Sequence, residues 1–196
     1  DQAFDSRHNR WNRGKSTFAR LLRERGYHVY DTDAAAKRLQ NEDAGIRRKL
    51  MEKFGEQIYT AEGLNRKLLA EEVFAQPRLL KWLNGVVHPV VEQDFQQWKA
   101  GYSHERLLFV ESAILYESGF DKLVDKVVLV TASEEIRIGR VMKRDGISQE
   151  AAKQRMANQL PENVKVAKAN IVIYNESKTA LSDNLEAVLG QLKASL

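Results

Sequence analysis

The sequence predicts an α/β fold in which helices cover both faces of a parallel β-sheet. Short apolar segments alternate with longer amphipathic segments along the chain, as they do in successive βαβ units. One apolar segment, Lys126–Val130 (KVVLV), is β-branched and almost continuous, which is typical of a strand buried on both faces. Only three prolines occur in the 196 residues and no proline-rich linker divides them, so a single domain is expected over 1–196.

The individual elements follow from local patterns. Ser16–Arg25 places Phe18, Leu21 and Leu22 on one helix face, and Gly26 ends this helix before the first strand. Further along, Ser133 is a suitable N-cap that is followed by two glutamates in the first helical turn. The expected strands are Tyr27–Tyr30, Leu107–Val110, Lys126–Val130 and Asn170–Tyr174. The expected helices are Ser16–Arg25, Asp43–Phe54, Asn65–Ala75, Pro77–Asp94, Ser133–Arg144, Ser148–Gln159 and Leu181–Leu196.

Two segments are expected to be excursions from the sheet. Residues 41–101 are rich in helix and lack a convincing strand, which predicts an inserted helical lobe. The charged segment 138–160 predicts a second, smaller excursion.

Composition excludes several classes of function. The chain has no cysteine, so disulfide frameworks, thiolate zinc sites and cysteine nucleophiles are excluded. It has no apolar run near the roughly 20 residues that span a membrane, and no secretory signal, so a cytoplasmic location without a membrane partner is expected. The net charge of +4 is modest and the basic residues are scattered, which favours solvated surface or phosphate-bearing small ligands over nucleic acid. A monomer or weak homo-oligomer is expected.

A phosphate-binding motif opens the first helix. Gly14, Lys15, Ser16 and Thr17 match the second half of the pattern G-x-x-x-x-G-K-[ST], the P-loop. A helix N-terminus offers free N–H groups and a positive dipole end to a phosphate. Lys15 would reach the β- and γ-phosphates of ATP, and the Ser16 hydroxyl would bind Mg²⁺. The alternative is a glycine that ends a loop before a serine-capped helix, with Lys15 in solvent.

The residues before this motif do not fit the rest of the pattern. Position 9, where the first glycine belongs, is Asn9, and Arg10, Trp11, Asn12 and Arg13 stand between it and Gly14. Arg10 and Arg13 would attract phosphate by charge, but tryptophan and arginine do not allow the positive φ and close backbone approach that glycine allows. Codons that are permitted for residues 5–13 can, in a reading frame shifted by one nucleotide, encode Ile-Leu-Gly-Ile-Thr-Gly-Gly-Ile-Gly. That peptide has the pattern of an apolar strand followed by a glycine-rich phosphate loop. We therefore hypothesise an out-of-frame stretch that ends at Gly14, the alternative being a divergent loop. The nucleotide sequence of codons 5–14 decides between them.

Several spaced motifs, taken together, resemble one kinase family. They are Val29–Asp33 (VYDTD), Trp82–Asn84 (WLN) with Val87–Pro89 (VHP), Phe109–Glu117 (FVESAILYE), Arg137–Gly146 (RIGRVMKRDG) with Arg155–Gln159 (RMANQ), and Ala169–Asn175 (ANIVIYN). In this order, after the GKST motif, they resemble bacterial dephospho-CoA kinase, a P-loop kinase related to nucleoside monophosphate kinases. The likeness runs from about Gly14 to Leu196. It departs from the family pattern in the missing glycine loop and in Asn170, where an aspartate is usual.

The resemblance implies a function and a set of residues. Such kinases transfer the γ-phosphate of ATP to the ribose 3′-hydroxyl of dephospho-CoA, so ATP, Mg²⁺ and dephospho-CoA are the implied ligands. The implied fold is a P-loop kinase with a parallel sheet, a helical acceptor-binding lobe at 41–101 and a lid at 138–160. The implied catalytic residues are Asp33, Lys15, Arg140 and Arg144. The implied nucleotide-binding residues are Asn12, Arg13, Gly14, Lys15, Ser16, Thr17 and Asn175, the implied acceptor-binding residues are Asp31, Asp33 and His88, and the implied metal ligand is Ser16.

Each of these residues also has a purely structural interpretation. Asp31 and Asp33 would cap a helix that begins near Ala34. The two lid arginines would lie on a solvated basic face. His88 precedes Pro89, which disfavours helix and predicts a packed turn histidine.

Two other functions remain open. One is another small-molecule P-loop kinase, and the other is a catalytically impaired protein that binds nucleotide or CoA, because the glycine half of the loop is missing.

Overall fold

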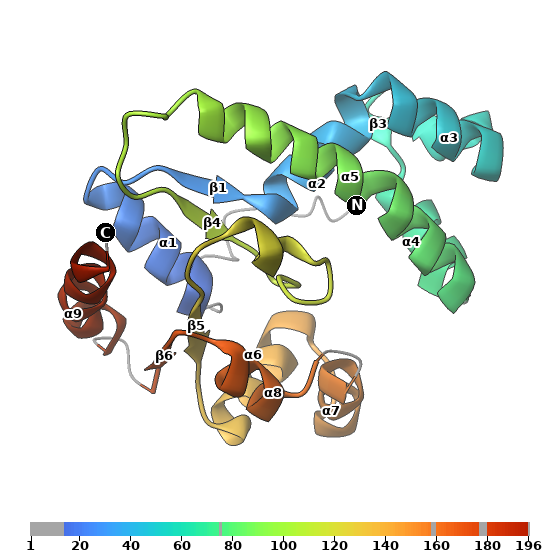
Figure 1. Ribbon diagram of the computed structural model, residues 1–196. Coiled ribbons are helices and arrows are strands. Elements are labelled where there is room, and N and C mark those ends of the chain that lie inside the picture. Colours follow the sequence, from blue (N-terminus) through green and yellow to red (C-terminus); the bar gives the residue numbers. More distant parts are fainter. Residues whose placement is uncertain (1–13, 75, 158–159, 177–179, 196) are drawn as a thin grey trace. The chain divides into compact units, whose positions relative to one another are not determined.

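The computed structural model describes residues 14–74, 76–157, 160–176 and 180–195 (Figure 1). It divides into two compact units. Unit 1 contains the chain up to Val29 and again from Arg106 to the C-terminal end, and unit 2 is Tyr30–Glu105. The strand β1 (Val29–Asp31) lies at the point where the chain passes from one unit to the other.

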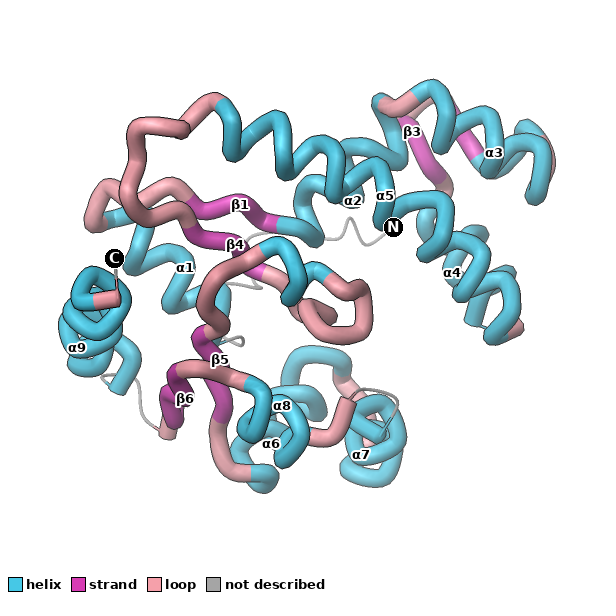
Figure 2. The backbone as a smooth tube through the Cα atoms, in the orientation of Figure 1, coloured by secondary structure: helices cyan, strands magenta, loops and turns pink. Residues whose placement is uncertain are grey.

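Unit 1 is built from strands and the helices that connect them. Its elements are α1 (Gly14–Glu24), β4 (Phe109–Glu111), the short 3₁₀ helix η2 (Phe120–Leu123), β5 (Val128–Thr131), α6 (Glu134–Asp145), α7 (Gln149–Ala157), α8 (Glu162–Lys168), β6 (Ile171–Tyr174) and α9 (Ala180–Ala194). Strands β5 and β6 pair in parallel, from Val128 opposite Ile171 to Thr131 opposite Tyr174 (Figure 2). Because α6, α7 and α8 connect these two strands, this is the βαβ connection that the alternating pattern predicted.

The core of unit 1 lies between its two terminal helices and the parallel strands. Phe18 and Leu22 of α1 pack with Ile173 of β6 and with a run of buried residues from α9, of which Leu185 has no exposed surface. The spacing of Phe18 and Leu22 puts both on the apolar face expected for the first helix. This packing fixes α1, and hence its N-terminal end at Gly14, against the strands.

Unit 2 is mostly helical. Its elements after β1 are α2 (Thr32–Glu42), α3 (Ala44–Phe54), the 3₁₀ helix η1 (Glu56–Ile58), β2 (Tyr59–Thr60), β3 (Gly63–Leu64), α4 (Arg66–Phe74) and α5 (Pro77–Ala100). Ile46 and Leu50 of α3 and Ile58 of η1 have at most 1% of their surface exposed. The expectation that 41–101 lacks strands is wrong at β2 and β3, which form an antiparallel hairpin. Two residues per strand are too few to show an alternating pattern.

Helix α5 corrects the interpretation of His88. The helix continues through Pro89, so His88 lies in a helix and not in a turn. Proline removes one backbone donor, and the residue before it usually avoids helical geometry. Val86, Val87 and Val91 on both sides of this position are all buried, and their packing outweighs the local preference. None of the described helices, α5 included, is long and apolar enough to cross a membrane.

Candidate active site

The phosphate motif lies where the sequence places it, at the start of a helix. Helix α1 begins at Gly14, so its first N–H groups belong to the GKST segment. Thr17 is half-buried. The predicted residues Asn12 and Arg13, and the side chains of Lys15 and Ser16, lie outside what the structure describes. The backbone of α1 thus supplies the helix N-terminus that phosphate binding requires.

Arg140 and Asn175, which are 35 residues apart, meet at the carboxyl end of the parallel strands. The Arg140 Nη2 donates to the carbonyl of Asn175 at 2.9 Å. The Asn175 N–H in turn donates to the carbonyl of Thr131, the last residue of β5, at 2.7 Å. Asn175 is 8% exposed, and its backbone N–H and carbonyl both take part in these bonds. In parallel α/β sheets this end of the strands is where ligands bind.

A second polar cluster at this edge was not predicted. The Arg137 Nε donates to the carbonyl of Ala132 at 3.1 Å, and its Nη1 lies 3.3 Å from Oε2 of Glu162. The other carboxylate oxygen of Glu162 accepts from the Thr131 hydroxyl. Glu162 opens α8, a helix that the sequence analysis missed although a glutamate after Pro161 is a usual helix start. The cluster ties α6 and α8 to the end of β5.

Arg144 lies one turn after Arg140 on α6, and its side chain is outside the described part. Among the described residues, the Arg140 side chain bonds to a neutral carbonyl and not to a carboxylate. No carboxylate of the described residues therefore neutralises its charge.

The resemblance implies that Arg140 neutralises phosphate charge in the transition state, and on this expectation Arg140→Ala should lower kcat at least about tenfold. Arg140→Lys keeps the charge but not the planar donor geometry, and should recover only part of the rate. The matched control is Lys143→Ala, an exposed cation on the same helix. Steady-state kinetics with varied ATP makes the comparison. Equal effects at the two positions would show that Arg140 is only a surface cation.

Asp31 and Asp33 both lie at the N-terminus of α2. The Asp31 Oδ1 accepts from the Ala34 N–H at 2.9 Å, so Asp31 is the N-cap, as its structural interpretation expected. Asp33 is half-buried in the first helical turn. The positive end of the helix dipole favours a carboxylate at this position.

Asn170 stands where the family pattern has an aspartate. Its side-chain oxygen accepts from the Val127 N–H at 2.7 Å, and its own N–H donates to the carbonyl of Val127 at 3.0 Å. An amide oxygen makes the same acceptor as a carboxylate here, so the substitution preserves the alignment of β5 and β6.

His88 is half-buried in α5, and burial lowers the pKa of its imidazole below the usual value of 6.5. The unfolded chain then binds a proton more readily than the folded chain. The free energy of unfolding should therefore fall as pH falls below about 6.5, by less than about 1 kcal/mol per pH unit because the group is only half-buried. Urea unfolding between pH 7.5 and 5.5 measures the slope. His88→Gln should flatten it, whereas His104→Gln, on a side chain that is 75% exposed, should not.

The residues that the structure describes contain no cluster of three or more histidine or acidic side chains that could hold a metal ion on its own. Such a cluster is not required for Mg²⁺ that arrives with a nucleotide, because phosphates and water supply most of its ligands.

Comparison with known proteins decides the family. The model of the dephospho-CoA kinase family matches residues 12–180. The chain belongs to the dephospho-CoA kinase family. The resemblance found in the sequence motifs is thereby confirmed, and the departures before Asn12 lie outside the matched range.

Individual members of the family cover most of the chain. A dephospho-CoA kinase from Porphyromonas gingivalis is 42% identical over 156 residues, which are 80% of this chain and 76% of the relative. One from Bacteroides fragilis is 36% identical over 168 residues, 86% of this chain and 82% of the relative.

Solved structures agree with the α/β P-loop kinase fold. TT1252 from Thermus thermophilus superposes with a TM-score of 0.77 at 36% identity, covering 91% of this chain and 92% of that one. The dephospho-CoA kinase from Campylobacter jejuni gives a TM-score of 0.71 at 28% identity, covering 93% and 94%.

Proposed function

We propose that this protein catalyses the ATP-dependent phosphorylation of the ribose 3′-hydroxyl of dephospho-CoA, giving CoA and ADP in the last step of CoA biosynthesis. The family match over residues 12–180 carries the proposal. The matched range includes the GKST start of α1 and the two aspartates at the start of α2. The 3′-oxygen attacks the γ-phosphorus, the bond from that phosphorus to the β–γ bridging oxygen breaks, and ADP leaves.

The side chains are assigned roles by the needs of this reaction. Phosphoryl transfer depends mainly on positioning and on neutralising charge. Lys15 would bind the β- and γ-phosphates, and Arg140 and Arg144 would stabilise the charge that spreads over the transferring group. Asp33 would accept the proton of the attacking hydroxyl.

The remaining assignments concern binding. Asp31 and His88 would contribute to the acceptor site, and the lobe at 41–101 would hold the pantetheine end of dephospho-CoA. The segment 138–160 would act as the lid over ATP. The nucleotide would be bound by Asn12, Arg13, Gly14, Lys15, Ser16, Thr17 and Asn175. Because the reaction consumes ATP and a small acceptor, we expect it in the cytoplasm, without nucleic acid or membrane, by a monomer or weak homo-oligomer.

Ser16 would be the protein ligand of Mg²⁺. Ser16 is the third residue of that helix, at the position where a P-loop hydroxyl binds the ion. When bound with ATP, Mg²⁺ would neutralise phosphate charge. The other ligands would be phosphate oxygens and water.

One assay tests the function. The full chain is incubated with ATP, Mg²⁺ and dephospho-CoA, and ADP and CoA are both measured. Stoichiometric ADP and CoA are expected. Turnover with AMP as acceptor but not with dephospho-CoA would assign a different small-molecule kinase, and binding of CoA without turnover would assign a catalytically impaired protein.

A further inference from the structure

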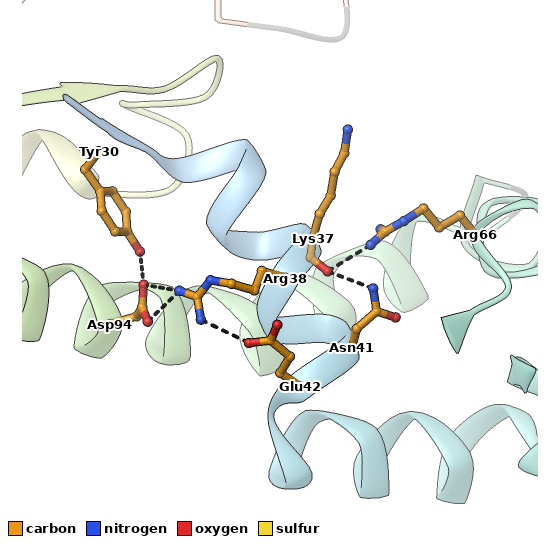
Figure 3. A network of polar contacts seen from close by, with 7 residues as sticks. All are labelled: Tyr30, Lys37, Arg38, Asn41, Glu42, Arg66 and Asp94. Carbon is orange, nitrogen blue, oxygen red and sulfur yellow. Dashed lines mark hydrogen bonds and ion pairs between the residues drawn. The ribbon is translucent and has the colours of Figure 1, made fainter. Parts of the chain in front are cut away.

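A carboxylate on α5 bonds to the chain on both sides of the two aspartates. Tyr30 precedes Asp31 directly, and its hydroxyl donates to Oδ2 of Asp94 at 2.7 Å. Arg38, further along α2, places its Nη2 2.7 Å from both carboxylate oxygens of Asp94 (Figure 3). One side chain from another helix thus binds the segment that carries Asp33 at both of its ends.

The two bonds are strong ones. Tyr30 is 6% exposed, and its ring packs against Phe95 and Trp98 with centroids 5.2 and 5.4 Å away. Burial, together with the Asp94 carboxylate, raises the pKa of the Tyr30 phenol, which therefore remains a neutral donor. The hydrogen bond to Asp94 also raises the pKa of Arg38. The Asp94 side chain is only 22% exposed, so its charge-assisted bonds are partly shielded from water.

The geometry of a helix relates this network to Asp33. Arg38 comes five residues after Asp33, which places it about 140° around the α2 axis and about 7.5 Å along it. The Asp94 contact therefore holds α2 from a different face than the one that carries Asp33. It restrains both rotation of α2 about its axis and sliding along it.

The far end of α2 is restrained as well. Arg66 donates to the Lys37 carbonyl at 2.9 Å, and the Asn41 amide donates to the same carbonyl at 3.3 Å (Figure 3). The Tyr59 hydroxyl donates to the carbonyl of Gln40 at 2.6 Å. These bonds satisfy carbonyls in the last turns of the helix. The Asp94 network adds a restraint through Tyr30, which precedes the first turn, and through Arg38.

We propose that Asp94 is a positioning residue for phosphoryl transfer, which fixes Asp33 by binding Tyr30 and Arg38 together. The inference rests on the proposed function, because it takes Asp33 as the group that receives the hydroxyl proton. Small displacements of a reacting group are costly in enzymes, so the effect of Asp94 should appear in kcat and not in the binding of ATP.

Asp94→Asn tests this with two separate measurements. The amide can still accept from Tyr30 but loses the charge that holds Arg38. We expect kcat to fall about tenfold while KM for ATP stays within about twofold. We also expect faster amide hydrogen exchange in 31–38, with 44–54 of α3 unchanged. Tyr30→Phe, which keeps the buried ring and loses the hydroxyl, should shift both measurements in the same direction by less.

Glu52→Gln is the matched control, since Glu52 faces Arg48 across 3.9 Å on α3 with both side chains about 70% exposed. It should change neither measurement. The inference is overturned if Asp94→Asn leaves exchange in 31–38 unchanged, or if exchange rises and kcat does not fall. Failure of the wild-type protein to phosphorylate dephospho-CoA would overturn the proposed function instead, and the exchange measurement would still decide whether Asp94 fixes α2.

Discussion

Asp33→Asn is expected to lower kcat at least about 100-fold, because a positioned general base contributes about 10²–10⁴ to the rate of a proton transfer. Asparagine has nearly the shape of aspartate but cannot accept the proton of the attacking hydroxyl. The loss of one carboxylate from the first turn of α2 should cost at most about 1 kcal/mol of unfolding free energy. Steady-state assays with dephospho-CoA, paired with urea unfolding, separate these two effects.

A carboxylate at the same helix position elsewhere provides the control. Asp33 is the second residue of α2 after the N-cap Asp31, and Glu135 is the second residue of α6 after the N-cap Ser133. Glu135 is exposed. Glu135→Gln should therefore cost a similar amount of stability and leave kcat unchanged. If Asp33→Asn reduced kcat no more than this control does, Asp33 would be a helix-terminus charge and not a base.

Much of the fold could be predicted from sequence because its signals are local. The apolar run at Lys126–Val130 predicts a strand, and β5 lies at that place in the sequence. The spacing of Phe18 and Leu22 predicts an amphipathic helix, and α1 contains both residues. The helix α8 was missed as an element because it has only seven residues, whereas α2 was expected only as a helix that begins near Ala34. The prediction that His88 lies in a turn was wrong, since the packing of the buried valines around it keeps α5 helical through Pro89.

The sequence predicted the contiguous motifs of the site but not the contacts between distant residues, because its signals are local. The GKST motif and the aspartates of Val29–Asp33 are contiguous, so their residue types could be recognised without knowing the fold. Contacts such as Arg140 with Asn175 and Tyr30 with Asp94 join positions 35 and 64 residues apart. Residue spacing along a helix or strand predicts only near neighbours, and only packing brings distant residues together.

Lys15→Ala is expected to reduce kcat/KM for ATP by about 100-fold or more, because an ammonium group that contacts the transferring phosphate stabilises charge throughout the reaction. The loss of kcat/KM should be larger in this chain than the removal of one lysine–phosphate contact would cause in a usual P-loop. A usual P-loop surrounds the phosphates with N–H groups from a glycine-rich turn, and no glycine precedes Gly14 in this chain. Lys15 and the first N–H groups of α1 would then carry a larger share of the attraction for phosphate than in a usual P-loop.

Lys15→Ala should leave the free energy of unfolding almost unchanged, since alanine is at least as good a helix former as lysine. Arg20→Ala is the control on the same helix. Arg20 is exposed and pairs with Glu24 one turn away, so its loss should cost under about 0.5 kcal/mol and leave ATP turnover unchanged. Kinetics with varied ATP and thermal unfolding of both variants make the comparison. Near-normal kcat/KM in Lys15→Ala would mean that Lys15 does not contact phosphate, and that the GKST segment is a serine-capped helix start without a phosphate site.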